Sequence, residues 1–277
     1  MTPAAFSPVL PLSDGNVIPQ LGLGVYKVED TVASTLVAGA IEAGYRHIDT
    51  AALYNNERGV GEGVRASGVP REEIFVTTKV WNDRHGYDET QRAFDESLEL
   101  LGMDYVDLYL IHWPAPEQNR YTEAWRALVK LQEDGRVRSI GVSNFKSHHL
   151  NRLRDTSDVL PVLNQVELHP WLPQLETRTF DRSLGILTES WSPLARGRVL
   201  GNDILDSIAD KHGKSPAQVV LRWHIQLGLV VIPKSNSLDR IRENSQVFDF
   251  TLDVADVAAI AGLETGERTG LDPDDHG

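Results

Sequence analysis

The sequence predicts an α/β fold, a (β/α)8 TIM barrel with a short N-terminal β-hairpin, and we expect one domain over residues 1–277. Short apolar runs alternate with segments of helical period, and no Pro/Gly/Ser-rich linker interrupts the alternation. Most of the runs are continuously apolar, as in parallel strands that are buried on both faces. The length of 277 residues also fits such a barrel, which commonly needs about 250.

The hairpin is expected first in the chain. Leu10–Leu12 and Val17–Ile18 are short strand-forming runs, and the turn-forming segment Ser13–Asn16 lies between them. The barrel strands follow in a regular succession. In chain order, they are expected at Leu21–Val25, His47–Asp49, Ile74–Lys79, Val106–His112, Val137–Val142, Leu163–Glu167, Ile186–Trp191 and Val230–Pro233.

Helices are expected between the strands. The clearest is Tyr121–Asp134, whose apolar residues recur three and four positions apart. Asp88–Leu101 shows the same stripe. A further helix starts with a capping box at Ser215, has Pro216 in its first position, and runs to Gln226.

An open, doubly wound sheet is the competing fold. If it bound a dinucleotide, it would normally carry a Gly-x-Gly-x-x-Gly loop after an early strand. Gly22–Lys27 lacks the third glycine, and Gly59, Gly61 and Gly63 lie inside a helical stretch. The barrel is therefore favoured.

Composition limits the class of protein. The apolar fraction of 41% and charged fraction of 24% are typical of a soluble globular protein. The chain has no cysteine, Met1–Phe6 lacks the features of a signal peptide, and no apolar run approaches the ~20 residues needed to span a bilayer. We expect a cytoplasmic protein without a membrane partner. The net charge of −13 argues against nucleic acid as a partner.

Polar or aromatic residues stand at the ends of nearly all the expected strands. In a (β/α)8 barrel the functional groups lie at these carboxyl ends. Asp49, Lys79 and His112 end three successive strands, and Tyr54 follows Asp49 closely. We expect these four side chains to converge on one rim. Each has an alternative role when taken alone, and Lys79 could be the Schiff-base lysine of a barrel aldolase.

Four longer segments show a resemblance to a known family. They are Gly44–Gly61, Leu98–Trp113, Gly141–Phe145 and Ile232–Ser235. With them the chain resembles the aldo-keto reductases over essentially its whole length. Within that family it is most similar to bacterial 2,5-diketo-D-gluconate reductases and their actinobacterial relatives.

The resemblance implies NADP-dependent reduction of a carbonyl, with Asp49, Tyr54, Lys79 and His112 as catalytic residues. Reduction needs a hydride at carbon and a proton at oxygen. A phenol normally keeps its proton up to about pH 10, so its anion must be stabilised. We expect the Lys79 ammonium to do this and Asp49 to hold Lys79 by an ion pair. Tyr54 is then the proton donor, and His112 orients the carbonyl oxygen.

The resemblance also implies NADPH as cofactor. Trp191 matches the aromatic residue on which the nicotinamide stacks, and Lys234 and Arg240, beside a helix start, match the pocket for the 2′-phosphate. The residues assigned to the cofactor are Gly24, Val25, Asp49, Ser143, Asn144, Gln165, Trp191, Ser192, Pro193, Leu194, Arg196, Lys234, Ser235, Asn236, Arg240, Glu243 and Asn244.

The resemblance assigns five residues to the substrate, namely Tyr26, Tyr54, Trp81, His112 and Trp113. The loop after His112 is short and the tail Glu264–Gly277 is polar, so we expect a shallow, open pocket for small carbonyl compounds. Sugar-derived diketones, methylglyoxal-like aldehydes and β-keto esters all remain candidates. Relatives of this size are often monomers, and we expect a monomer here.

Two alternatives stay open. One is a regulatory protein of the same fold that binds NADPH with little turnover. The other is the aldolase with Lys79, which does not explain the cofactor residues. No metal site is expected, because no His-x-His pair stands at a strand end. The adjacent His148 and His149 should diverge on a helix, and His169 is expected to be structural.

Overall fold

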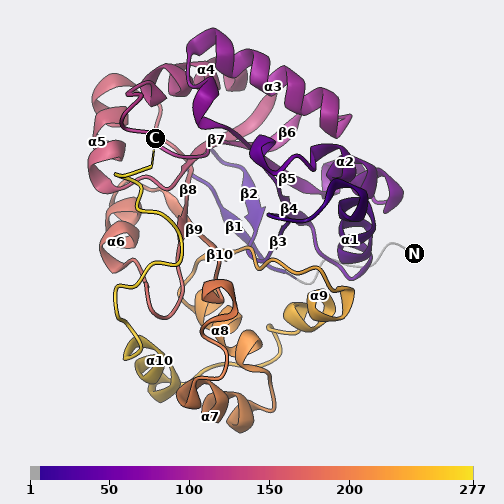
Figure 1. The fold of residues 1–277 in the computed structure, drawn as a ribbon, viewed down its shortest axis with the longest axis vertical. Coiled ribbons are helices and arrows are strands. Elements are labelled where there is room, and N and C mark those ends of the chain that lie inside the picture. Colours follow the sequence, from indigo (N-terminus) through magenta and orange to yellow (C-terminus); the bar gives the residue numbers. More distant parts are fainter. Residues whose placement is uncertain (1–6, 277) are drawn as a thin grey trace.

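A closed ring of eight parallel strands forms the centre of the computed structural model, which describes residues 7–276 (Figure 1). Neighbouring strands follow the chain order from β3 to β10, and single bridges from Leu21 to Val231 and from Gly24 to Lys234 close the ring. The strands are β3 (Leu23–Gly24), β4 (His47–Asp49), β5 (Phe75–Val80), β6 (Val106–Ile111), β7 (Val137–Ser143), β8 (Leu163–Glu167), β9 (Leu187–Trp191) and β10 (Val230–Val231).

The predicted barrel is confirmed. Six expected strands agree with the structure to within one residue at each end, whereas the first and last are shorter than expected. These two strands meet where the ring closes through isolated bridges, so fewer of their residues take part in a continuous ladder.

Helices surround the ring (Figure 1). They are α1 (Asp30–Glu42), α2 (Glu57–Ala66), α3 (Tyr87–Leu101), α4 (Tyr121–Glu133), α5 (Ser147–Thr156), α6 (Leu175–Ser183), α7 (Asp203–His212), α8 (Pro216–Gln226), α9 (Leu238–Ser245) and α10 (Val254–Ala261). Short 3-10 turns are η1 (Ala52–Tyr54), η2 (Arg71–Glu73), η3 (Asn82–Arg84) and η4 (Ala195–Gly197).

The capping box predicted for α8 is present. The Ser215 N–H donates to the Gln218 side chain at 2.9 Å, and the Gln218 N–H donates back to the Ser215 hydroxyl at 3.4 Å. The two groups satisfy donors that the first turn of the helix leaves free.

The glycines of α2 permit close packing between helices. A Cβ atom on Gly59 would lie 2.1 Å from the Asp30 carbonyl oxygen, and one on Gly61 would lie 1.9 Å from that of Leu101. A side chain at either position would push α2 away from α1 or α3. These glycines thus serve packing, in agreement with their expected helical position.

The predicted hairpin is also confirmed, as β1 (Val9–Pro11) paired with the antiparallel β2 (Val17–Pro19). It covers the amino end of the barrel. The Ser139 hydroxyl at the start of β7 donates to the Asp14 carboxylate at 2.7 Å, and Ile18 is fully buried among side chains from the barrel interior. The hairpin therefore occupies the amino end, and a site is expected at the carboxyl end, as in other barrels of this kind.

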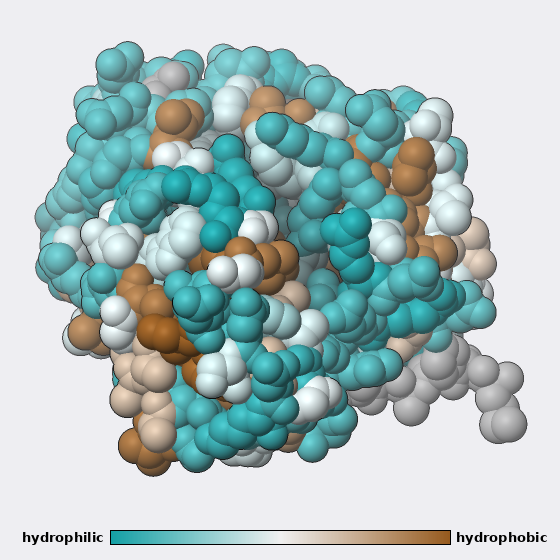
Figure 2. All heavy atoms as spheres, turned by 60° about the horizontal axis from the view of Figure 1, so that its bottom comes forward, coloured by the Kyte–Doolittle hydropathy of each residue, from teal (hydrophilic) through white to brown (hydrophobic). Residues whose placement is uncertain are grey.

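The segment after α10 crosses the carboxyl end of the barrel. It is the yellow trace in Figure 1, and it runs from α10 to a point beside α5. Figure 2 shows a largely hydrophilic outer face on which apolar residues form small groups. No helix within residues 7–276 combines the length and apolarity needed to cross a membrane. Met1–Phe6, where we expect no signal peptide, lies outside the described residues.

Candidate active site

A buried ion pair lies at the ends of β4 and β5. The Lys79 ammonium donates to the Asp49 carboxylate at 2.7 Å and to the Thr50 carbonyl oxygen at 2.8 Å. Lys79 is fully buried and Asp49 is only 2% exposed. The parallel pairing of the two strands places both residues at the same rim, which explains why the sequence brings them together.

Tyr54 and His112 lie beside this pair. The Lys79 nitrogen is 5.1 Å from the centre of the Tyr54 ring. The His112 ring, just after β6, meets the Tyr54 ring edge-on with 5.6 Å between centres, and Trp81 lies 5.1 Å from His112 in the same manner. The structure thus brings together the four side chains that were expected to converge.

The protonation states differ in part from the expectation. Burial raises the pKa of the Tyr54 phenol well above 10, and the Asp49 charge raises it further. Burial, followed by the Lys79 charge, lowers the pKa of His112 well below 6.5. The site therefore holds a protonated phenol beside a neutral imidazole at neutral pH.

Sequence reasoning missed a second buried acid in the barrel interior. The Gln165 side-chain amide donates to Asp49 at 2.7 Å and to Glu189 at 2.8 Å. Both donors of the amide point at acids, so its oxygen is left for another partner. Burial raises the pKa of Glu189, and the Asp49 charge adds to this effect. A charged residue in the middle of the expected strand β9 was the signal that could have identified Glu189.

A cavity of about 1030 Å³ opens from these residues along the carboxyl end of the barrel. It extends from Tyr54 and His112 to Arg240 and Asn244 on α9. The predicted site residues that line it are Gly24, Tyr26, Asp49, Tyr54, Trp81, His112, Trp113, Ser143, Asn144, Gln165, Trp191, Ser192, Pro193, Leu194, Arg196, Lys234, Ser235, Arg240, Glu243 and Asn244.

Three predicted residues do not belong to this lining. Lys79 lies beneath it, behind Asp49. Val25 is buried, and its N–H donates to the Asp49 carbonyl oxygen at 3.1 Å, so Val25 supports the site from behind. Asn236 is exposed to solvent outside the cavity.

The far end of the cavity carries positive charge without a carboxylate partner. Within residues 7–276, Lys27, Lys234 and Arg240 form no ion pair with an acid. Burial, followed by the Lys27 charge, lowers the pKa of Lys234. Unpaired cations in a chain of net charge −13 indicate a site for an anionic group. This end fits a phosphate, as the assignment of NADPH requires. The contribution of Lys27 was missed, although it adjoins Tyr26 in the sequence.

The C-terminal tail also lines the cavity, which the sequence did not reveal. Gly270, Leu271 and His276 contribute to the lining, and the His276 ring lies 4.6 Å from that of Trp113. The tail therefore forms a wall, and the pocket is less open than expected.

The histidine pair on α5 differs from the prediction too. The His148 and His149 rings converge, with centres 3.9 Å apart, and both face Asp274 of the tail. Together they could hold a metal ion. However, the His149 Nδ1 accepts the Lys146 N–H at 3.1 Å, so its proton lies on Nε2, the atom that faces Asp274. The Lys146 ammonium already binds Asp274 at 2.6 Å. The cluster is thus better suited to holding the tail than to binding a metal.

Comparison with known proteins agrees with this geometry. Residues 20–265 match the model of the Aldo/keto reductase family. The chain is 54% identical over 267 residues to an aldo-keto reductase of Mycolicibacterium smegmatis, covering 96% of this chain and 97% of that protein. It is 50% identical over 271 residues to the methylglyoxal reductase DkgA of Escherichia coli, covering 97% and 98%.

A solved structure is similar as well. A mutant of Gox0644 in complex with NADPH superposes with a TM-score of 0.94 at 49% identity, covering 98% of this chain and 99% of that one. The predicted family is confirmed. The chain belongs to the aldo/keto reductase family.

Proposed function

We propose that the protein is an NADPH-dependent reductase of small aldehydes and ketones. The observation that carries this proposal is one cavity with a protonated phenol and a neutral imidazole at one end and unpaired cations at the other. The first end suits a carbonyl oxygen, and the second suits the 2′-phosphate that distinguishes NADPH from NADH.

Tyr54 supplies the proton in this proposal. NADPH, when bound, would supply the hydride for the carbonyl carbon, and the Tyr54 hydroxyl releases its proton to the carbonyl oxygen. Because His112 is neutral, it can donate a hydrogen bond that orients this oxygen without adding charge. The phenolate left on Tyr54 gains stabilisation from the nearby Lys79 ammonium, which Asp49 keeps in place.

Trp191 and its neighbours are proposed to hold the nicotinamide. The Trp191 indole N–H donates to the Asn144 side-chain oxygen at 2.9 Å, which fixes the plane of the indole. The ring is thereby presented as a flat surface for stacking. The Gln165 side-chain oxygen, left free by the two acids, can accept from the carboxamide.

Small carbonyl compounds are the proposed substrates. Tyr26, Trp81, Trp113 and the tail residue His276 surround the reaction end of the cavity with aromatic groups. Such a lining favours compact and uncharged molecules. The similarity to a methylglyoxal reductase supports dicarbonyls as the class to test first, ahead of keto-sugars and β-keto esters.

The alternatives are less well supported. A sensor that binds NADPH with little turnover has no need for all four side chains in one place. An aldolase needs a neutral lysine with access to substrate, whereas Lys79 is fully buried and paired with Asp49.

The test is NADPH oxidation, followed by absorbance, across a panel of carbonyl compounds that includes methylglyoxal and 2,5-diketo-D-gluconate. We expect turnover by the native protein and its loss in Tyr54→Phe, which should still bind NADPH. NADPH binding without consumption on any carbonyl would instead support the sensor. Covalent trapping of a substrate by borohydride would support the aldolase.

A further inference from the structure

A buried carboxylate that the proposed chemistry does not use lies at the end of β8. The Glu167 side chain has no exposure to solvent, and it follows Gln165 by two residues in the same strand. An ionised group in such a place requires several hydrogen-bond donors. The donors around the Glu167 carboxylate therefore indicate which part of the chain this carboxylate holds in place.

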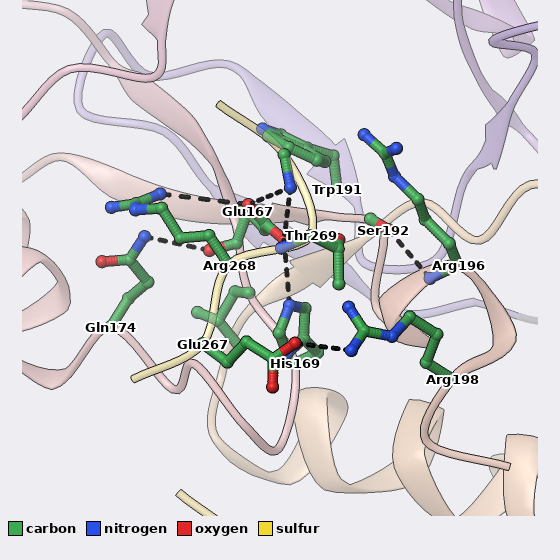
Figure 3. Close-up of polar contacts among 12 residues, drawn as sticks. Glu167, His169, Gln174, Trp191, Ser192, Arg196, Arg198, Glu267, Arg268 and Thr269 are labelled. Atoms are coloured by element: carbon green, nitrogen blue, oxygen red, sulfur yellow. Dashed lines mark hydrogen bonds and ion pairs between the residues drawn. The ribbon is translucent and has the colours of Figure 1, made fainter. Parts of the chain in front are cut away.

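Most of these donors belong to the C-terminal tail (Figure 3). The Thr269 N–H and hydroxyl each donate to Glu167 at 2.6 Å, and the Gly270 N–H donates at 3.1 and 3.2 Å to its two oxygens. His169 contributes a further contact at 3.0 Å, and the Arg268 guanidinium lies 4.0 Å away. Burial by itself would raise the pKa of Glu167, but these hydrogen bonds lower it to about 2. The carboxylate thus remains ionised and keeps its hold on the tail.

The same contact presses the tail against Trp191. A Cβ atom added to Gly270 would lie 2.5 Å from the Trp191 indole and 3.0 Å from a Glu167 oxygen. Only glycine fits between the two groups. The backbone at Gly270 is therefore in direct contact with the proposed nicotinamide platform.

Other ties of the tail are more exposed. Glu267 pairs with Arg198, on the loop after β9, at 2.5 Å, but both side chains are about half exposed, at 48% and 51%. Asp272 and Asp274 pair with Lys146, with exposed fractions between 29% and 43%. Exposed ion pairs contribute little to stability. Among the contacts of the tail within residues 7–276, the buried one at Glu167 is the strongest candidate for its anchor.

We propose that Glu167 is a positioning residue for the carbonyl substrate. It anchors the tail at Thr269 and Gly270, and thereby holds Leu271 and His276 in the wall of the cavity, where His276 lies beside Trp81 and Trp113. This inference rests on the proposed function, because it assigns that wall to the substrate. Glu167 touches neither substrate nor cofactor and acts only through the tail.

Trypsin provides a test that does not depend on activity. Arg268 is the last basic residue that trypsin recognises in the chain, so one cleavage after it releases residues 269–277. We expect the native protein to resist this cleavage and Glu167→Gln to undergo it, because the variant loses the charge that holds the two backbone N–H groups. Mass spectrometry of the intact protein reports the loss of the nine-residue peptide directly.

Two further variants separate the anchor from general destabilisation. In Gly270→Ala the new methyl group forces the tail off Trp191 while Glu167 stays intact, so the same cleavage is expected. Asp181→Asn replaces another fully buried acid, one that binds Asn164 and Thr188 and has no contact with the tail among those that the structure describes. It should resist cleavage after Arg268 even if its melting temperature falls.

Steady-state kinetics then test the assignment to substrate. For Glu167→Gln and Gly270→Ala we expect the KM for the carbonyl to rise about tenfold and kcat to change less than about threefold, as when a group that binds ground and transition states equally is lost. The Kd for NADPH should change less than about threefold.

Several outcomes would overturn the proposal. If both variants resist trypsin as well as the native protein does, the tail is held without Glu167. Cleavage with an unchanged KM would show that the tail is not a substrate wall. If the native protein reduces no carbonyl, the proposed function fails with the substrate assignment, and the trypsin pattern still decides whether Glu167 anchors the tail.

Discussion

Two lysines of the site differ in how their charge is balanced, Lys79 beneath the cavity and Lys234 in its lining. Lys79 is fully buried and satisfied by Asp49 and Thr50 within the protein. Lys234 is exposed and has no acidic partner within residues 7–276. At the reaction end the protein completes its electrostatics before a ligand arrives, so that little reorganisation is needed during the chemistry. At the far end the positive charge of Lys234 has no counter-charge until an anionic ligand binds. This contributes to the affinity for such a ligand and to selection between ligands.

The largest expected effect comes from breaking the buried pair. Lys79→Met leaves the Asp49 charge unpaired, and we expect it to lower the free energy of unfolding by about 3–5 kcal/mol. Loss of the ammonium beside Tyr54 should also reduce kcat by about 100- to 10,000-fold. Urea unfolding and steady-state kinetics measure the two effects.

The matched control is the double variant Asp49→Asn with Lys79→Met. Removing both charges should restore most of the stability, because no unpaired charge is left, whereas activity should remain low. If Lys79→Met were as stable as the native protein, leaving the Asp49 charge unpaired would cost no stability. The two lysines would then not differ energetically in the way described.

A second prediction concerns pH and extends the comparison to Glu167, whose partners are mostly neutral donors. Its pKa falls from 4.5 to about 2 on folding. A lowered pKa contributes stability that is fully present above about pH 4.5 and is lost as the pH falls through about 2, and here it amounts to about 3 kcal/mol. Glu167→Gln should therefore be less stable at pH 7, and the gap should close as the pH falls from about 4 to 2.

Asp181 provides a control of opposite sign in the same experiment. Burial raises its pKa to about 7, so folding favours its protonated form. That stability is present below about pH 4 and is lost as the pH rises through about 7. Thermal melts of Asp181→Asn against the native protein should show a difference that grows toward high pH. If the stability difference from the native protein changed with pH in the same direction for both variants, the two pKa shifts could not have opposite signs.

The smallest expected effect is at the exposed cations. Arg240→Ala should weaken NADPH binding about tenfold, which corresponds to about 1.4 kcal/mol, and leave NADH binding within about twofold. The free energy of unfolding should change by less than about 0.5 kcal/mol, because Arg240 has no acidic partner to leave unpaired. Titration of each cofactor at fixed salt measures the difference.

Arg242→Ala is the control on the same helix. Arg242 pairs with Asp239 at 3.5 Å and does not line the cavity. It should leave the affinity for both cofactors unchanged. An equal loss of NADH and NADPH affinity in Arg240→Ala would show that Arg240 does not contact the 2′-phosphate.

Much of the fold could be predicted because short stretches of the sequence determine its strands and helices. Continuous apolar runs identified the strands, and the capping box at Ser215 located the start of α8. Strand ends identified most of the cavity, since parallel neighbours end at the same rim. Family resemblance added residues that periodicity alone does not mark, such as Arg240 on α9.

Contacts between distant segments could not be predicted. Thr269 and Glu167 are 102 residues apart, and no periodic pattern links them. His148 and His149 both face Asp274, which lies on the same tail. The high pKa of Tyr54 also escaped prediction, because its largest cause is burial, which the spacing of residues in the sequence does not reveal.

The hairpin at the amino end limits the side from which ligands can reach the cavity. Because β1 and β2 cover the amino end of the described barrel, a cofactor and a substrate would both reach the cavity from the carboxyl end. Two strands of three residues each thus confine access to the end of the barrel that lies opposite them.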